Sequence, residues 1–546
     1  LTLCTLWVFQ KTCSALMKHG IVGTIQLFFI SFIKKVPGGH KLIEAELEKA
    51  KQDLIKELKP PTSKHKVYHQ LPDEPIEREI IREELLYQLS QEKQIQNKRG
   101  HGGIYVKIHQ KYNKYVHPET DGQTEIIGII DQWLTMKEEA YLYFSHSNVL
   151  YPFLFPGVRK FDLELIAWCS NLLYAAQPAG NITSGGTESI FCAMNCWRSY
   201  GEQVRGIGGM DSGVVPNVVM SKTAHPAFYK ACHYLRIEVR AVDIYKDDEL
   251  FGTVDLKKLE AAVDDRTICI VGSAPCFPYS VVDDIEGICE IAKRKGNIPV
   301  HVDNCLGGFV LSFLYDSQVI DKPFDFRVDG VCSISCDMHK QAGSDKGCSA
   351  IIYNKFNYRR YQYYSYVDWP GGLYCCPSFQ GSSNGGLKAV AWAMLLRKGK
   401  NRLKEDALKL FKKVGYLAQQ LTEKVDDCDV LGKPMACGVA FKFKGKLLDY
   451  DYGIAEALHE VGGWEVNRLQ FPSCLFFQAG HQWIDELDQL IEDINKATVL
   501  VLKDPKKYNK SGMASVYGTA ASFPDRNIVK ETCGTYLDVI HTPYYE

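Results

Sequence analysis

Two side chains of this sequence have the types and the spacing that one kind of cofactor chemistry requires. Asp303 ends the run His301-Val-Asp303, and Lys340 ends the run Ser333-Ile-Ser-Cys-Asp-Met-His-Lys340, 37 positions further on. A lysine amine condenses with an aldehyde, and a carboxylate keeps a pyridine nitrogen protonated. These are the two electronic contacts that turn pyridoxal 5′-phosphate (PLP) into an electron sink. The pair therefore predicts an enzyme rather than a protein that only binds.

The elements that must position this pair are short β-strands. The runs 298–302 and 331–335 are rich in β-branched residues, and Asp303 and Lys340 follow them closely. Ligands of open α/β sheets bind at the carboxyl ends of the strands. The alternative is that Asp303 caps a turn and Lys340 is a solvated surface lysine, the usual fate of such a residue on its own.

A third motif provides the phosphate contacts that this cofactor needs. The sequence Thr183-Ser-Gly-Gly-Thr-Glu-Ser-Ile190 leads into an apparent helix over 190–197. Backbone N–H groups and the Thr187 hydroxyl at the positive end of a helix can bind a phosphate, and Gly186 lets the backbone come close. Ordinary helix capping by Ser and Thr is the alternative.

Two histidines are further candidates. His225 precedes Pro226 at the start of a helical stretch, where an imidazole can stack on a pyridine ring, although a histidine beside a proline is more often a turn residue. His339 lies next to Lys340 and can donate to a cofactor phosphate. The spacing equally allows His339 to be a neighbour that faces solvent.

The composition sets bounds on the class of protein. The chain has 546 residues, 46% of them hydrophobic, and a formal net charge of -1, so it can bury a large core in more than one domain. Balanced charge without a basic block or a zinc-spaced His/Cys cluster argues against a nucleic-acid partner. The 19 scattered cysteines indicate reduced thiols of a cytosolic environment rather than a disulfide framework.

The amino-terminal region has the pattern of a membrane-associated segment. Residues 1–35 contain an apolar run over 21–33 that is shorter than the roughly 20 residues needed to cross a bilayer and ends at Lys34 and Lys35. We expect an interfacial or truncated anchor, with the basic residues placing the body on the cytoplasmic side. A buried helix is the alternative. Residues 36–61 read as a charged helical stalk that stops at Pro60 and Pro61.

The rest of the chain divides into four predicted parts. Residues 62–150 form the first, mostly helical segment of the catalytic body, and helical stretches alternate with β-rich runs over 151–395. Such alternation predicts a mostly parallel sheet covered on both faces. We expect a small α/β domain over 396–505 and a polar, Tyr-rich tail over 506–546.

These motifs together resemble those of the sphingosine-1-phosphate lyases, within the PLP-dependent group II decarboxylase family. The resemblance runs from about Tyr105 to Asn527 and covers most of the chain. The residues that carry it are the 183–189 motif, the histidine of 225–231, the run from His301 to Phe309, the Asp-x-His-Lys run with Lys346-Gly347, and the segments 155–160, 371–374 and 381–382. The apolar start followed by a charged stalk also resembles the eukaryotic members.

The resemblance implies a fold-type I PLP enzyme with a large domain, a small carboxyl-terminal α/β domain and active sites shared across a homodimer. Lys340 then carries the cofactor, Asp303 pairs with the pyridine nitrogen, His225 stacks on the ring, and Gly186, Thr187 and His339 contact the phosphate. Gly381 and Ser382 lie on a loop given to the partner subunit, and Ser382 is expected to contact the cofactor. Lys346 and Tyr105 match residues that act on the substrate phosphate and in catalysis.

Two positions depart from the family pattern. Tyr151 stands where a histidine associated with the active site is expected, and Ser383 stands where an arginine is expected. Tyrosine still donates a hydrogen bond, but it does not titrate near neutral pH. We keep Tyr151 as a substrate-binding candidate and expect a changed phosphate affinity, pH optimum or substrate.

The resemblance thus implies an enzyme on the cytosolic side of the endoplasmic reticulum membrane. It is expected to cleave sphingosine 1-phosphate or a related phosphorylated long-chain base to a long-chain aldehyde and phosphoethanolamine. One alternative is an amino-acid decarboxylase of the same family, although Lys346 and the apolar start argue against it. Another is a catalytically silent scaffold that binds lipid phosphate or a partner, against which Asp303 and Lys340 argue.

Overall fold

The computed structural model describes residues 132–151, 154–209, 212–247, 249–480, 485–509 and 525–542. The predicted apolar segment 1–35, the stalk 36–61, most of the segment 62–150 and Tyr105 lie outside these ranges. Across the described ranges, every helix is too short or too polar to traverse a lipid bilayer.

The large domain is built on a sheet of seven strands in the order β1-β7-β6-β5-β4-β2-β3. The strands are β1 (Ala179–Thr183), β2 (Asn217–Ser221), β3 (Glu238–Val242), β4 (Thr267–Ser273), β5 (Val300–Asp303), β6 (Val331–Asp337) and β7 (Ser349–Tyr353). Neighbours from β6 to β3 are parallel, whereas β7 is antiparallel to both β1 and β6. The predicted mostly parallel sheet is confirmed.

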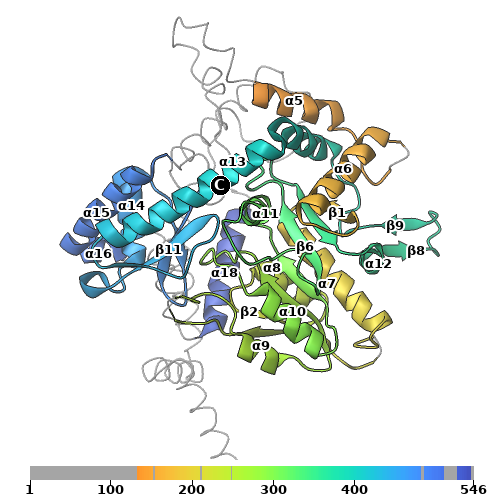
Figure 1. Ribbon diagram of the computed structural model, residues 1–546, viewed down its shortest axis with the longest axis horizontal. Helices are drawn as coiled ribbons and strands as arrows, with labels where there is room; N and C mark the ends of the chain where they lie inside the picture. Colours follow the sequence, from red (N-terminus) through yellow and green to blue (C-terminus); the bar gives the residue numbers. More distant parts are fainter. Residues whose placement is uncertain are drawn as a thin grey trace, which may run out of the picture.

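Helices cover both faces of this sheet, as Figure 1 shows. They are α6 (Pro156–Leu172), α7 (Gly186–Gln203), α8 (Pro226–Tyr234), α9 (Leu256–Ala262), α10 (Ile285–Arg294), α11 (Gly308–Asp316) and the short α12 (Phe356–Arg359). The core accordingly forms separate clusters, one between the sheet and α6, α10 and α11, and another between the sheet and α7 and α8. Burial on both faces explains why the central strands read as continuous apolar runs.

The smaller carboxyl-terminal domain has a four-stranded antiparallel sheet in the order β10-β11-β13-β12. Its elements are β10 (Cys428–Val430), β11 (Gly438–Phe443), η3 (Gly445–Leu447), α14 (Asp451–Gly462), β12 (Asn467–Leu469), β13 (Cys474–Gln478), α15 (Leu487–Lys503) and α16 (Pro505–Asn509). A helix α18 (Arg526–His541) follows in the predicted tail. The long helix α13 (Gly385–Lys424) joins the domains and is interrupted at Gly399, where φ is 65°, near the predicted boundary between 395 and 396.

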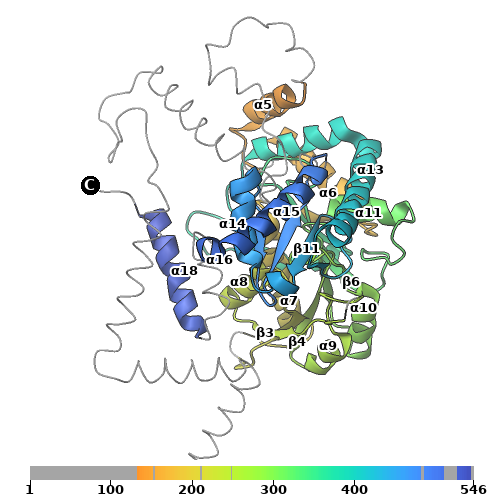
Figure 2. The ribbon, with the colours of Figure 1, turned by 90° about the vertical axis from the view of Figure 1, so that its left-hand side faces the viewer.

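Two peripheral elements stand out in the views of Figures 1 and 2. The helix α5 (Gln132–Phe144) packs on α13, at the top of both figures. After the turn η2 (Arg360–Gln362), the strands β8 (Tyr364–Tyr366) and β9 (Tyr374–Cys376) form a hairpin that projects from the large domain. The hairpin and its turn carry exposed Tyr364, Trp369 and Leu373.

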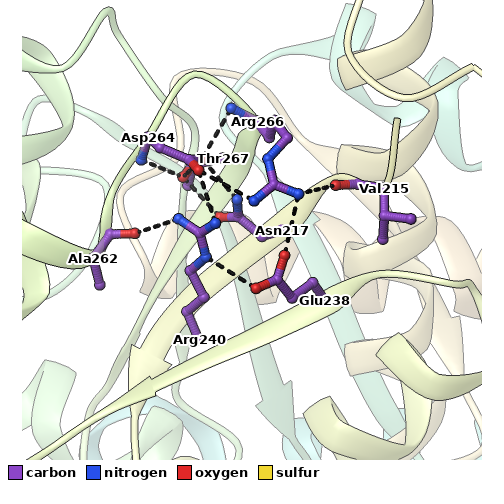
Figure 3. Close-up of polar contacts among 8 residues, drawn as sticks. All are labelled: Val215, Asn217, Glu238, Arg240, Ala262, Asp264, Arg266 and Thr267. Atoms are coloured by element: carbon purple, nitrogen blue, oxygen red, sulfur yellow. Dashed lines mark hydrogen bonds and ion pairs between the residues drawn. The ribbon is translucent and has the colours of Figure 1, made fainter. Parts of the chain in front are cut away.

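The amino ends of the parallel strands are tied together by an ion-pair network (Figure 3). The Arg240 guanidinium lies 2.8 Å from Asp264 and 3.2 Å from Glu238, and Asn217 donates to Asp264 over 2.7 Å. Burial opposes ionisation of Asp264, but the bonds from Asn217 and Arg240 outweigh it and lower the pKa to about 2. The network stabilises the sheet edge opposite the carboxyl ends.

Candidate active site

Lys340 lies on the turn that follows β6, directly beside a buried carboxylate. Its Nζ is 2.9 Å from Oδ2 of Asp337, the last residue of the strand, and Nε2 of His339 is 3.5 Å from the same oxygen. Burial alone would raise the pKa of Asp337, but Lys340 and His339 act in the opposite direction and the pKa is lowered. Asp337 is therefore an anion that fixes the position of the lysine.

Asp303 is the last residue of β5, as Asp337 is the last residue of the neighbouring strand β6. Asp303 pairs in register with Ser335 of β6. Its Oδ1 accepts hydrogen bonds from the Cys305 backbone N–H at 3.1 Å and from the Ser335 hydroxyl at 3.0 Å. With only 7% of its surface exposed, the carboxylate has a fixed orientation at the carboxyl end of the sheet. The structure thus places Asp303 and the turn that bears Lys340 side by side.

A buried histidine supports Asp303 from within the sheet. His301 alternates onto the same face of β5, and its ring nitrogens lie 2.8 Å from the Ser333 hydroxyl and 3.4 Å from the Ser335 hydroxyl. Trp197 of α7 donates to Ser333 over 3.0 Å. Burial lowers the pKa of His301 to about 4, so the ring is neutral at pH 7. It orients the serine that binds Asp303 without adding a charge.

The amino terminus of α7 lies against the ends of β5 and β6, next to Cys305 and Asp337. A Cβ on Gly186 would lie 2.8 Å from the Cys305 sulfur and 3.0 Å from both carboxylate oxygens of Asp337, so the close approach requires glycine. The helix begins at Gly186 rather than at the predicted residue 190, which places exposed Thr187 within the first turn. The positive end of the helix therefore lies at the carboxyl edge of the sheet, as a phosphate site requires.

Lys346 lies on the loop that returns from Lys340 to β7. The base of this loop is closed where His339 N–H donates to the Cys348 carbonyl, and Cys348 N–H donates to Nδ1 of His339, both at 3.1 Å. The acceptor role of Nδ1 leaves Nε2 as the nitrogen that carries the proton of a neutral His339. Desolvation, which is the larger effect, and the nearby Lys340 lower the pKa of Lys346 to about 8, and part of the side chain remains exposed to solvent.

Three other predicted site residues, His225, Ser382 and Tyr151, lie on other elements of the described structure. His225 is exposed and caps α8, with its Nδ1 accepting from the Ala227 N–H at 3.2 Å. Ser382 accepts from Asn148 at 3.0 Å, and Tyr151 is 52% exposed. The stacking role of His225, and the cofactor and substrate roles of Ser382 and Tyr151, stay predictions.

The residues present fit PLP in both type and arrangement. A lysine and a buried carboxylate stand at neighbouring strand ends, and Gly186 leaves room that any side chain would fill. In such a site, Lys340 would hold the cofactor aldehyde, Asp303 its ring nitrogen and the start of α7 its phosphate. No group of three or more potential metal ligands occurs among the described residues.

Residue types alone did not reveal the full set of supporting side chains. Asp337 and Ser335 belong to the motif that ends at Lys340. Only the structure shows that Lys340 pairs with Asp337 and that Ser335 binds Asp303. Lys137 of α5 pairs with Asp345 at 2.5 Å, a contact between residues 208 positions apart. No local pattern indicates a pairing of that kind.

Comparisons with known proteins show which family this chain resembles. The pyridoxal-dependent decarboxylase conserved domain matches residues 104–363. A sphingosine-1-phosphate lyase of Drosophila melanogaster is 34% identical over 95% of this chain and 88% of its own length, and sphingosine-1-phosphate lyase 1 of Mus musculus is 31% identical over 99% and 89%. The solved structure of a Burkholderia pseudomallei sphingosine-1-phosphate lyase has a TM-score of 0.72 and 27% identity, covering 88% of this chain and 99% of that one.

Proposed function

Because this chain belongs to the sphingosine-1-phosphate lyase family, we propose that it is a PLP-dependent carbon–carbon lyase acting on phosphorylated long-chain bases. The substrate is sphingosine 1-phosphate or a related sphingoid base 1-phosphate, and the products are a long-chain aldehyde and phosphoethanolamine. The observation that carries the proposal is the placement of Lys340 and Asp303 at the ends of adjacent parallel strands.

The chemistry that PLP supplies when bound is an electron sink for the pair released when the C2–C3 bond of the substrate breaks. Asp303, which accepts hydrogen bonds from Cys305 and Ser335, would stabilise a protonated ring nitrogen. Lys340 lies at the same sheet edge, and the substrate amine would replace it at the cofactor aldehyde. Cleavage also requires a base that removes the proton of the C3 hydroxyl.

Lys346 and Tyr105 are the candidates for proton transfer and for recognition of the substrate phosphate. With a pKa of about 8, Lys346 is present in both protonation states near neutral pH, which suits either task. Lys340 and Lys346 together bring positive charge to the loop after β6, and this charge would attract the phosphate of the substrate. Tyr105 lies outside the described residues.

The active enzyme is proposed to be a homodimer in which residues 381–382 complete the site of the partner subunit. The apolar residues of the β8–β9 hairpin support this proposal, because Tyr364, Trp369 and Leu373 are 59%, 51% and 79% exposed in a single chain. Large exposed apolar patches mark interaction surfaces. Membrane association through residues 1–35 is proposed from the sequence of that segment, and the cytosolic side of the endoplasmic reticulum is proposed from the family resemblance.

The experiment that tests the proposed substrate class offers the purified PLP-loaded protein three alternatives in parallel. They are a sphingoid base 1-phosphate, the same base without phosphate, and a panel of amino acids. Release of long-chain aldehyde from the phosphorylated base alone supports the proposal. Release of carbon dioxide from an amino acid, without aldehyde, would instead establish the decarboxylase alternative.

A further inference from the structure

A buried cation from a distant helix reaches the loop that carries Lys346. Lys137 of α5 has only 9% of its surface exposed, and its Nζ lies 2.5 Å from Oδ1 of Asp345, the residue before Lys346. An ammonium buried to this extent is costly unless a carboxylate compensates for it. The pair therefore determines how α5 and the loop fit together.

The loop itself needs such a tether. Asp345 and Lys346 lie between Gly343 and Gly347, which have φ values of 80° and 99°. Glycine in these conformations leaves the backbone free to adopt others. Backbone hydrogen bonds hold the loop up to Ser344, whose N–H donates to the Met338 carbonyl at 3.1 Å, and again at its far base, where His339 N–H donates to the Cys348 carbonyl. The contact at Asp345 adds a fixed point beside Lys346.

The helix α5, which carries Lys137, is held in place by its packing on α13. Lys398 of α13 approaches the loop so closely that a Cβ on Gly343 would lie 3.2 Å from its Nζ. Lys398 is paired with Asp406 at 3.4 Å. Among the described residues, the charged groups at this loop include Lys137 from α5, Lys398 from α13, which is itself paired with Asp406, and Lys340 with Asp337 from the β6 turn.

The same helix also meets the second predicted site loop. The Tyr141 hydroxyl accepts from Nδ2 of Asn384 at 3.3 Å, and the Ser147 carbonyl just after the helix accepts from Gly385 N–H at 2.9 Å. Asn148 binds Ser382. One helix with its following turn therefore contacts both the Lys346 loop and the 381–384 loop.

We propose that Lys137 is a positioning residue, which fixes Lys346 in the active site by binding the carboxylate of Asp345. The assignment rests on the proposed function, because it gives Lys346 a role in turnover. Lys137 itself is expected to touch neither substrate nor cofactor. Loss of the pair should therefore lower kcat through a misplaced Lys346 while the cofactor stays bound.

The test is a double-mutant cycle of Lys137→Met and Asp345→Asn in the PLP-loaded enzyme. Each single change should lower kcat about 10- to 100-fold, the range that small misplacements of catalytic groups cost. The double variant should fall no more than about twofold below the weaker single variant, because both remove one interaction. Lys137→Arg keeps a cation at this place and should recover most of the activity.

A second readout does not depend on turnover. Amide hydrogen exchange of the peptide 341–347 should become faster in Lys137→Met and in Asp345→Asn. Arg240→Met is the matched control, since it removes a partly buried ion pair at the opposite sheet edge (Figure 3) and should change neither kcat nor exchange in this peptide. Asp345 is 46% exposed in its side chain, so Asp345→Asn provides a test if Lys137→Met fails to fold.

The two readouts separate failure of this proposal from failure of the proposed function. A wild-type enzyme that releases no aldehyde refutes the proposed function, and faster exchange in the variants then still supports the tether. An active wild-type enzyme whose variants keep full kcat and unchanged exchange overturns the role of Lys137. Effects that multiply in the double variant overturn it as well.

Discussion

The Lys340 ammonium lies 2.9 Å from Oδ2 of Asp337, a carboxylate whose side chain is 1% exposed. Both residues belong to the same strand end, and His339 approaches the same oxygen. Lys340, the predicted cofactor lysine, is thus held by a neighbour to which the sequence analysis assigned no role of its own. Asp337 also lies against Gly186, so the carboxylate connects the β6 turn with the start of α7.

Replacing this carboxylate should destabilise the folded protein. Asp337→Asn leaves the Lys340 charge without its buried partner, and we expect a loss of about 3 kcal/mol in the free energy of unfolding. Urea denaturation at pH 7 measures this loss. Equal stability of variant and wild type would contradict the pairing.

The same variant carries a prediction about pH. The folded state lowers the pKa of Asp337, so its stabilising effect is present above the unfolded value of about 3.9 and is lost as the pH falls through the lower folded value. The stability difference between wild type and Asp337→Asn should therefore be constant near neutrality and shrink in acid. A difference that grew on acidification would contradict the sign.

Asp303→Asn should impair catalysis much more than folding. The amide oxygen can still accept from Cys305 and Ser335, but the side chain loses the charge that stabilises a protonated pyridine nitrogen. We expect kcat to fall about 100-fold or more, with the cofactor still bound. Steady-state kinetics and the cofactor absorbance measure these effects. Wild-type kcat in this variant would exclude Asp303 as the ring partner.

Lys346 should give the enzyme an ionisation near pH 8. Below about pH 8 its ammonium is charged and attracts the substrate phosphate, and above it the charge is lost, so kcat/KM should fall with rising pH through this range. The fall should be absent in Lys346→Met, which has a low kcat/KM throughout. A pH series of kcat/KM for both proteins tests this prediction. An unchanged profile in the variant would assign the ionisation to another group.

Asn148 should hold the 381–384 loop in place. Its Oδ1 accepts from the N–H groups of Leu150 and Ser383, both at 3.1 Å, and its Nδ2 donates to Ser382. Asn148→Ala removes these bonds and should cost about 1 to 3 kcal/mol of stability. Thermal unfolding measures the loss. An unchanged Tm would show that other contacts fix the loop.

Much of the arrangement around Asp303 and Lys340 could be predicted from the sequence. The β-rich runs are local signals, and their ends fix where the two residues emerge from a parallel sheet. The pattern also places the glycines of the predicted phosphate site after β1, although α7 starts earlier than its apolar residues indicate. Local propensity is sufficient for these features because each depends on neighbours in the chain.

Other features depend on contacts between distant residues. The antiparallel insertion of β7 between β1 and β6 follows from pairing across the sheet, and no local pattern specifies it. The contacts of Lys137 with Asp345 and of Asn148 with Ser382 join residues 208 and 234 positions apart. A lysine on a helix normally faces solvent, so its burial becomes visible only when α5 packs against the loop.

The measurement that tests the central claim most directly is a product assay with a single control variant. Purified protein is loaded with PLP and given a sphingoid base 1-phosphate, and aldehyde and phosphoethanolamine are quantified beside Lys340→Ala. The account predicts equal amounts of both products from the wild type and neither above background from Lys340→Ala. Absence of both products from a wild-type protein that binds the cofactor, or their undiminished release by Lys340→Ala, would contradict it.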